Sequence, residues 1–188
     1  MKKKTEYILN IAFLIIIILW TIFVLIVGPS KFISSIGIHN VYLILFVSSF
    51  LGGFTTVSAV TVYPSMIALT FGGLNPFIVG AVTGIALSFA NLVFYNFGMK
   101  GRTIVEASTN KFSMFARRVV RWINQMPDIM LPILIGAYVA LTPLPNNLLM
   151  VSAGLFRIKL RNIILPLFIG NIIAMILIIF IAKYFQTF

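Results

Sequence analysis

The chain has 188 residues, of which 61% are hydrophobic and 9% are charged, and its net charge is +11. Because soluble globular domains carry roughly a quarter charged residues, this composition excludes such a domain and predicts an all-α polytopic membrane protein. The chain has no cysteine, one histidine and three acidic residues, so we expect no metal site and no cofactor.

The positive charges stand beside apolar segments, with little soluble sequence between them to form a nucleic-acid module. We therefore expect membrane lipids, in particular anionic headgroups, as partners, and no nucleic acid. There is no Ser-His pairing, HExxH motif or pair of carboxylates at membrane depth, so we expect no catalytic residues and no enzyme. The sequence is compatible with a monomer and with a homo-oligomer.

Residues 1–40 are expected to hold a first span and an external link. The apolar stretch Tyr7–Val27 follows three lysines and is too long for a signal-peptide core. No small-residue cleavage site follows it, so we predict a retained span. The polar link Lys31–Asn40 contains His39, which we expect to be exposed.

Residues 41–97 form the first predicted repeat. An apolar arm, Val41–Val60, is followed by a turn at Thr61–Pro64, a short returning arm and a long span over Phe77–Phe97. Small residues in that span favour close helix packing over pore lining. They are Gly80, Ala81, Gly84, Ala86, Ser88 and Ala90.

Residues 98–128 are the one substantial stretch expected outside the membrane. Apolar residues recur in it at helical spacing, with Lys and Arg on other faces. Two interpretations fit this pattern. The segment is either an amphipathic helix on an anionic leaflet or a connector helix packed under the bundle.

Residues 129–188 form the second predicted repeat, around the segment from Leu141 to Leu148. The flanking arms, Ile129–Leu141 and Leu148–Phe156, are shorter than the roughly 20 residues that a spanning helix needs. Pro143 and Pro145 oppose a continuous helix. We predict a re-entrant hairpin whose turn lines a cavity, with one kinked spanning helix as the alternative. A last span is expected over Asn162–Ala182.

With both hairpins re-entrant, the basic residues divide twelve to two between the two sides of the membrane. This predicts a cytoplasmic N-terminus and an external C-terminus. We expect the membrane to be the plasma membrane of a prokaryote. The smaller group is Lys31 and Lys183. The larger is Lys2, Lys3, Lys4, Lys100, Arg102, Lys111, Arg117, Arg118, Arg121, Arg157, Lys159 and Arg161.

The two halves also show an internal repeat. A shift of 81 residues aligns four identical residues without a gap, among them the turn formers. The pairs are Thr61 with Thr142, Pro64 with Pro145, Gly73 with Gly154 and Leu74 with Leu155. Because the predicted hairpins open to opposite sides, the copies are inverted, as in many transporters with broken helices near the midplane.

The sequence resembles the DedA family, also called the SNARE-associated Golgi protein or VTT-domain superfamily, over about Val41–Ala182. The motifs that carry the resemblance are Pro143-Leu144-Pro145, Ser152-Ala153-Gly154-Leu155, and Pro64 with Gly72-Gly73-Leu74-Asn75-Pro76. The resemblance implies two opposed re-entrant hairpins and a role in moving phospholipids or polyprenyl-phosphate carriers across the bilayer.

One departure from this family concerns energy coupling. Relatives with proposed proton coupling carry acidic residues in the first hairpin and arginines around the second. This chain has Thr61, Ser65, Leu141, Asn146 and Asn147 in those regions. Because a proton relay normally needs a titratable group inside the membrane, the difference argues against direct proton coupling.

We therefore expect a scramblase-like or flippase-like protein that needs no ATP, since no phosphate-binding glycine loop with lysine is present. Asn146 and Asn147 would attract a phosphate at the start of a half-helix, or only cap it. A small-solute or ion transporter and a non-transporting assembly partner are the alternatives. The candidate substrate-binding residues are Thr61, Pro64, Thr142, Pro143, Pro145, Asn146, Asn147, Arg157 and Arg161.

Overall fold

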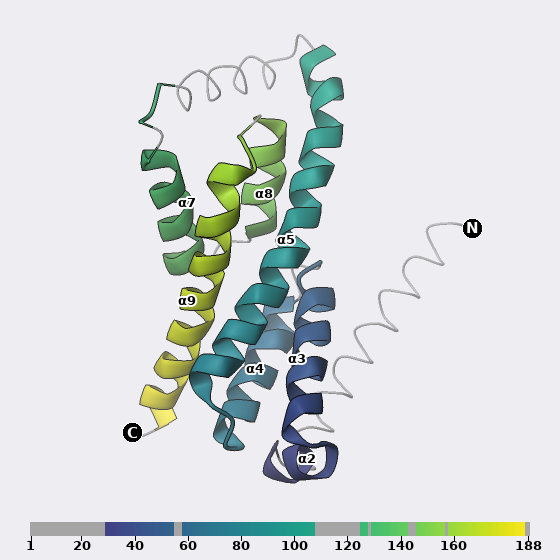
Figure 1. The fold of residues 1–188 in the computed structure, drawn as a ribbon, viewed down its shortest axis with the longest axis vertical. Coiled ribbons are helices and arrows are strands. Elements are labelled where there is room, and N and C mark those ends of the chain that lie inside the picture. The colour runs from purple at the N-terminus through teal and green to yellow at the C-terminus, as the bar shows by residue number, and fades with distance from the viewer. Residues whose placement is uncertain are drawn as a thin grey trace, which may run out of the picture.

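The computed structural model describes residues 29–54, 58–107, 125–127, 129–142, 146–156 and 158–186. Within these ranges every regular element is an α-helix, so the predicted all-helical class is confirmed there. The helices, labelled in Figure 1, are α2 (Pro29–Ile36), α3 (Ile38–Gly52), α4 (Ser58–Phe71), α5 (Pro76–Ala107), α7 (Met130–Leu141), α8 (Asn146–Leu155) and α9 (Arg161–Gln186).

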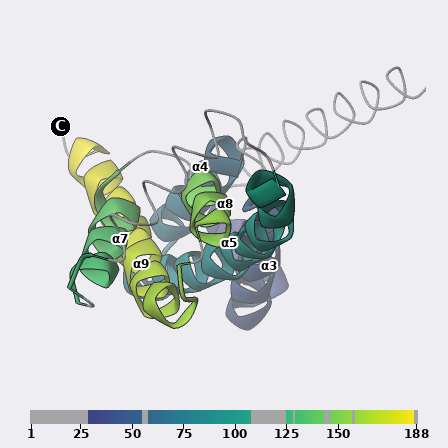
Figure 2. The ribbon, with the colours of Figure 1, turned by 90° about the horizontal axis from the view of Figure 1, so that it is seen from above.

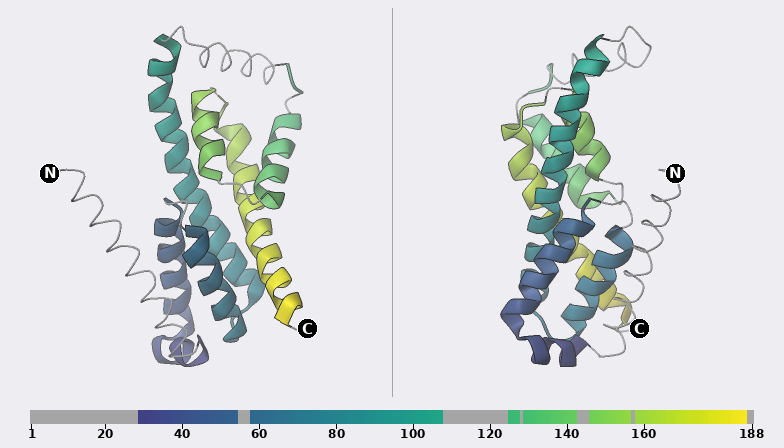
Figure 3. Two further views of the ribbon diagram at one scale, coloured as in Figure 1. Left: turned by 180° about the vertical axis from the view of Figure 1, so that it is seen from behind. Right: turned by 90° about the vertical axis from the view of Figure 1, so that its right-hand side faces the viewer.

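Two long helices, α5 and α9, run along much of the bundle (Figure 1). Two shorter helical hairpins, α3–α4 and α7–α8, pack against them. The α3–α4 hairpin begins and ends near α2, whereas the α7–α8 hairpin begins and ends at the opposite end (Figures 1 and 3). The tips of the two hairpins therefore point toward each other. Seen along the bundle, α3 lies beside α5 and α7 beside α9, on opposite sides (Figure 2).

Both long helices can cross a membrane. Each contains an apolar segment of 26 residues, Pro76–Gly101 in α5 and Arg161–Gln186 in α9. At about 1.5 Å per residue, such a helix is longer than the hydrocarbon core, which is about 30 Å thick. Many large apolar side chains also point outward, for example Leu148 at 66% and Leu165 at 66% exposure. These features are typical of a helical membrane protein.

The link between α4 and α5 follows from its residue types. Gly73 has a φ of 106°, a left-handed conformation that favours glycine, and the Leu74 N–H donates back to the Leu69 carbonyl at 3.2 Å. Asn75 then caps α5, because its Oδ1 accepts the Phe77 N–H at 2.9 Å. The next residue is a proline, which suits the first position of a helix. The returning arm and the long span, which we predicted as separate segments, are thus two separate helices.

The α7–α8 hairpin has the predicted bounds almost to the residue. α7 ends at Leu141, and Thr142 is extended with φ −100° and ψ 136°, the conformation expected before a proline. The Thr142 hydroxyl donates to the Tyr138 carbonyl at 2.6 Å. α8 begins at Asn146, whereas we predicted Leu148, and α9 covers the predicted last span. Pro143 and Pro145 lie outside the described residues.

The predicted turn at Thr61–Pro64 is wrong. α4 continues through these residues, and Pro64 is an exposed residue inside it. The chain turns earlier, where α3 ends at Gly52 and the Gly53 N–H donates to the Ser49 carbonyl at 2.9 Å. Proline is tolerated inside membrane helices because neighbouring groups can satisfy the freed carbonyl. The glycine pair therefore ends the helix here, and the proline does not.

Three further predictions need correction or lie outside the described residues. The polar link Lys31–Asn40 is mostly helical, since it contains most of α2 and the first residues of α3, although His39 is exposed as expected. α5 continues to Ala107 and so extends into the predicted external stretch. The first span, Tyr7–Val27, and residues 108–124 lie outside the described residues, as do Thr55 and Thr56.

The order of the helices repeats in the two halves, but the residues that the sequence alignment pairs do not occupy equivalent positions. Helices α3, α4 and α5 are followed in the same order by α7, α8 and α9. The gapless alignment nevertheless pairs residues with different roles. Gly73 lies in the left-handed turn after α4, whereas Gly154 lies inside α8. Likewise Pro64 is within α4, whereas Pro145 precedes α8. The 81-residue register is therefore wrong at the level of structure.

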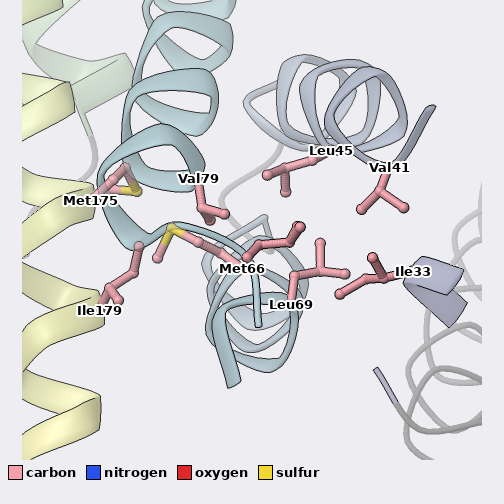
Figure 4. Packing of buried hydrophobic residues seen from close by; sticks show 9 residues of the cluster. Ile33, Val41, Leu45, Met66, Leu69, Val79, Met175 and Ile179 are labelled. Carbon is pink, nitrogen blue, oxygen red and sulfur yellow. The ribbon is translucent and has the colours of Figure 1, made fainter. Parts of the chain in front are cut away.

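The buried apolar residues form two separate cores. The α3–α4 core fills the space between that hairpin, α2, α5 and α9 (Figure 4). It consists of Ile33, Val41, Leu45, Met66, Leu69, Leu74, Val79, Met175 and Ile179. The α7–α8 core lies toward the other end of the long helices. It consists of Tyr95, Ile135, Val139, Met150, Ala153, Ile158, Ile163 and Leu167.

Helices α5 and α8 approach each other through glycine. A Cβ atom at Gly98 would overlap the carbonyl oxygen of Val151, and one at Gly154 would overlap the carbonyl oxygen of Tyr95. The Tyr95 hydroxyl also donates to the Ile158 carbonyl at 2.8 Å, just after α8. Small residues permit such backbone contact between membrane helices, which fixes α8 against the long helix.

Helices α5 and α9 cross in the same way. A Cβ atom at Gly84 would lie 2.7 Å from the backbone nitrogen of Ile172, and one at Gly80 would lie 2.6 Å from a side-chain carbon of Ile176. The predicted packing role is therefore confirmed for both glycines. Of the small residues in this span, Ser88 differs, because it takes part in the polar contacts described next.

Candidate functional site

A layer of polar side chains separates the two apolar cores, and we call it the central polar layer. It consists of Ser88 on α5, Asn146 and Asn147 at the start of α8, and Asn171 on α9. Ser88 is residue 13 and Asn171 is residue 11 of the two 26-residue apolar segments. The layer therefore lies near the middle of both long helices. Buried polar groups at this depth need partners, because hydrocarbon offers none.

A chain of hydrogen bonds joins three of these residues. The Asn146 Nδ2 donates to Asn171 Oδ1 at 3.0 Å, and the Asn171 Nδ2 donates to Ser88 Oγ at 2.9 Å. The Ser88 hydroxyl in turn donates to the Gly84 carbonyl at 2.8 Å. Asn171 is 1% exposed and Ser88 is fully buried. This series of hydrogen bonds connects α8, α9 and α5 across the interior of the bundle.

A further hydrogen bond joins the two hairpins at their tips. The Asn147 Nδ2, on the first turn of α8, donates to the Gly53 carbonyl at the end of α3 at 3.2 Å. The carbonyls in the last turn of a helix lack partners within it and carry a partial negative charge. The amide of Asn147 supplies one such partner. The start of α8 and the end of α3, which carry opposite partial charges, therefore meet within the bundle.

The simple capping interpretation does not hold for Asn146. A helix cap requires the side-chain oxygen to accept an N–H of the first turn. Asn146 Oδ1 is buried and accepts no hydrogen bond from any described residue, while its Nδ2 is used by Asn171. The amide therefore presents one satisfied donor and one unsatisfied acceptor to the interior of the protein.

Two buried hydroxyl groups near the layer also lack partners among the described residues. They are Ser49 on α3, one turn before Gly53, and Thr83 on α5, next to Gly84 and one turn before Leu87. Other buried hydroxyls bond to the carbonyl one turn earlier, as Ser88 on α5 does at 2.8 Å and Thr70 on α4 does at 2.9 Å. Buried polar atoms without a hydrogen-bond partner among the described residues therefore occur in the middle of the bundle, on α3, α5 and α8.

The predicted site residues divide into three groups. Asn146 and Asn147 lie in the central polar layer, and half-buried Thr142 lies nearby at the end of α7 but bonds only to its own helix in the described structure. Pro64 is exposed on α4 and Arg161 is exposed at the start of α9, so neither joins this layer. The third group lies outside the described residues or has an undescribed side chain. It comprises Thr61, Pro143, Pro145 and Arg157.

Exposed basic residues lie at the ends of the long helices. Lys159 and Arg161 are exposed before and at the start of α9, and Lys100 is exposed on the far half of α5. Lys31, on α2, lies at the other end of the bundle, as does the end of α9 that carries Lys183 (Figure 1). Lys31, Lys100, Lys159 and Arg161 therefore lie away from the central polar layer.

Two members of the layer, Asn171 and Ser88, were not predicted as site residues. Asn171 stands alone in the apolar sequence Pro166-Leu-Phe-Ile-Gly-Asn-Ile-Ile-Ala. A polar residue in such a position is costly in lipid unless it finds a partner, and this signal could have identified it. Its partners lie 25 and 83 residues away in sequence, so the pairing itself was not predictable from local pattern.

No family model, curated protein or solved structure matches this chain. Within the described ranges, no group of three metal-ligating side chains comes together either. The side chains of the layer are neutral amides and a hydroxyl, so the chemistry that they offer is hydrogen bonding. Such groups can bind a polar molecule reversibly, because neutral hydrogen bonds are weaker than those to charged groups.

Proposed function

We propose that the chain is a transport protein that moves phospholipid or polyprenyl-phosphate headgroups across the bilayer without ATP, in the manner of a DedA-type scramblase or flippase. The observation that carries the proposal is the hydrogen bond from Asn147 to the Gly53 carbonyl. It joins the tips of two hairpins that enter the bundle from opposite ends, at a polar layer near the middle of both long helices.

The physical argument starts from what an amphiphile needs in order to cross. Its headgroup must find polar partners at mid-depth, while its tails stay in hydrocarbon. The central polar layer offers such partners, and the outer faces of the hairpins carry exposed apolar residues such as Leu51 and Leu141. Neutral hydrogen bonds contribute only about 0.5–1.5 kcal/mol each, so the headgroup is not trapped there.

The charges at the ends support the same proposal. Lys100, Lys159 and Arg161 would gather anionic headgroups at the cytoplasmic face, where each basic residue contributes about 1 kcal/mol of attraction to an anionic surface. This orientation places the C-terminus outside, in the plasma membrane of a prokaryote. The resemblance of Pro143-Leu144-Pro145 and Ser152-Ala153-Gly154-Leu155 to motifs of the DedA family is a second support.

The proposed re-entrant arrangement predicts which residues share a side of the membrane. Because the chain has no cysteine, single-cysteine variants can be labelled without background. We expect an impermeant maleimide to label Gln125→Cys and Lys159→Cys from the cytoplasmic side, and Lys31→Cys and Gln186→Cys from the outside. Labelling of Gln125→Cys and Lys159→Cys from opposite sides would mean that α7 and α8 together span the bilayer, and would reject the hairpin.

The transport activity is tested with the purified 188-residue chain in liposomes that contain a phospholipid labelled on an acyl chain or a polyprenyl phosphate labelled on its isoprenoid chain. Dithionite, which reduces only the label in the outer leaflet, should bleach the inner-leaflet label as well when the protein is present. Liposomes with an unrelated helical membrane protein are the control. A monodisperse protein that leaves the inner leaflet protected would reject the proposal, and solute uptake without lipid movement would select the small-solute alternative.

A further inference from the structure

The unsatisfied oxygen of Asn146 is the starting point. Every other polar group in the hydrogen-bond chain has a partner: Asn171 both accepts and donates, and Ser88 does the same. Asn146 Oδ1 is buried and has none among the described residues. A buried acceptor without a donor is costly, so its persistence in a layer of satisfied groups calls for a physical reason.

The orientation of the Asn146 amide is determined by the rest of the chain. Rotating it alone would place its oxygen against Asn171 Oδ1, and two acceptors would then face each other. Reversing both amides would keep only two of the three hydrogen bonds, because the single Ser88 hydrogen cannot serve both Asn171 and the Gly84 carbonyl. At Asn146 the layer therefore presents an acceptor, and not a donor.

We propose that Asn146 Oδ1 receives a hydrogen bond from the moving headgroup and so selects headgroups that carry a hydroxyl or a primary ammonium group. This inference rests on the proposed function and adds a substrate class to it. A phosphocholine headgroup has no such donor, whereas phosphoethanolamine has an ammonium group and phosphoglycerol has hydroxyls. Asn146 contacts the headgroup directly, and Asn171 and Ser88 are positioning residues that hold its amide.

The test compares three acyl-chain-labelled lipids in the same liposomes, with phosphoethanolamine, phosphoglycerol or phosphocholine headgroups. One hydrogen bond is worth roughly five- to tenfold in rate, so we expect the first two to cross about five- to tenfold faster than the third. Ethanolamine and choline lipids have the same net charge, which separates donor capacity from charge. Movement of only one of the two donor lipids would identify the ammonium or the hydroxyl as the preferred group.

Substitutions test whether the selectivity between headgroups arises at Asn146. Asn146→Leu should bring the ratio of donor lipid to choline lipid to about one. Ser88→Ala should lower the ratio about two- to threefold, because the Asn171 amide loses the acceptor that orients it. A purely structural loss would slow all three lipids equally and leave the ratio unchanged. Asn40→Leu is the matched control, since exposed Asn40 bonds only to the Ile36 carbonyl at the far end of α3 and should keep the wild-type ratio.

The possible failures are distinguishable. Equal rates for all three lipids in the wild-type protein would show that Asn146 Oδ1 does not select headgroups and would overturn this inference, while leaving the proposed function intact. If no lipid moves at all, the proposed function fails as well. If Asn146→Leu does not fold, Ser88→Ala still tests the inference. A ratio of donor lipid to choline lipid equal to that of the wild type would contradict the role of Ser88 in positioning the Asn171 and Asn146 amides.

Discussion

Gly154→Ala is expected to lower the midpoint of thermal unfolding in detergent by roughly 5–10 °C, although alanine is ordinarily the better helix former. The added Cβ would overlap the carbonyl oxygen of Tyr95 and lie 2.7 Å from the backbone nitrogen of Met99. Both atoms belong to the backbone of α5 and cannot rotate away. Overpacking of this kind costs about 1–3 kcal/mol, and a rigid neighbour favours the upper part of that range.

The matched control for this effect is Gly101→Ala, on α5. A Cβ at Gly101 would lie 3.6 Å from the nearest heavy atom, a side-chain carbon of Leu155, which is an ordinary contact. This variant should unfold at or slightly above the wild-type midpoint. Size-exclusion chromatography after stepwise heating measures both. Equal midpoints for Gly154→Ala and Gly101→Ala would mean that α5 and α8 do not approach backbone to backbone.

Asn171→Leu is expected to reduce lipid movement in liposomes at least tenfold while changing thermal stability little. Leucine is close to asparagine in size and suits an apolar helix better, which offsets the loss of the interhelical hydrogen bonds. Those bonds, to Asn146 and Ser88, contribute on average about 0.6 kcal/mol each in membrane proteins. The variant would nevertheless remove one polar side chain from the central polar layer and leave the Asn146 amide without the acceptor that orients it.

Asn162→Leu, at the beginning of the same helix, is the control for this prediction. Asn162 is half-buried and lies outside the central polar layer, so its replacement should leave transport within about twofold of the wild type. Transport is read from dithionite bleaching, and stability from the unfolding midpoint of the same preparations. A folded Asn171→Leu protein with wild-type transport would show that the layer has no part in moving lipids.

The two hairpins differ in how far their sequences predict them. The α7–α8 hairpin was predicted closely, because Pro143 forces the preceding Thr142 out of helical geometry and so ends α7. The α3–α4 hairpin was misplaced, because Pro64 was interpreted by the same rule although it lies within α4. Proline ends a helix only where nothing else compensates for the lost donor. The Gly52-Gly53 pair was visible, but its effect depends on tertiary packing of Gly53 against Ala90.

The central polar layer shows a different limit. Asn146 and Asn147 were expected at the start of a short helix because they follow a proline-rich turn, and they do lie there. Their partners were not predictable, since Gly53 contributes a backbone carbonyl, which every residue has. Local sequence indicates where polar side chains occur within apolar segments. Which of them meet depends on how the glycine-lined crossings set the helices side by side.

The absence of formal charge in the interior has an electrical consequence. From Asn40 to Met99, from Ile129 to Phe156 and from Asn162 to Ala182, the sequence contains no acidic, basic or histidine side chain. Moving one elementary charge through 100 mV changes the energy by about 2.3 kcal/mol, but moving neutral amides changes it hardly at all. Separation of the hairpin tips should therefore be insensitive to membrane voltage, and only the charge of the passenger itself would respond to the field.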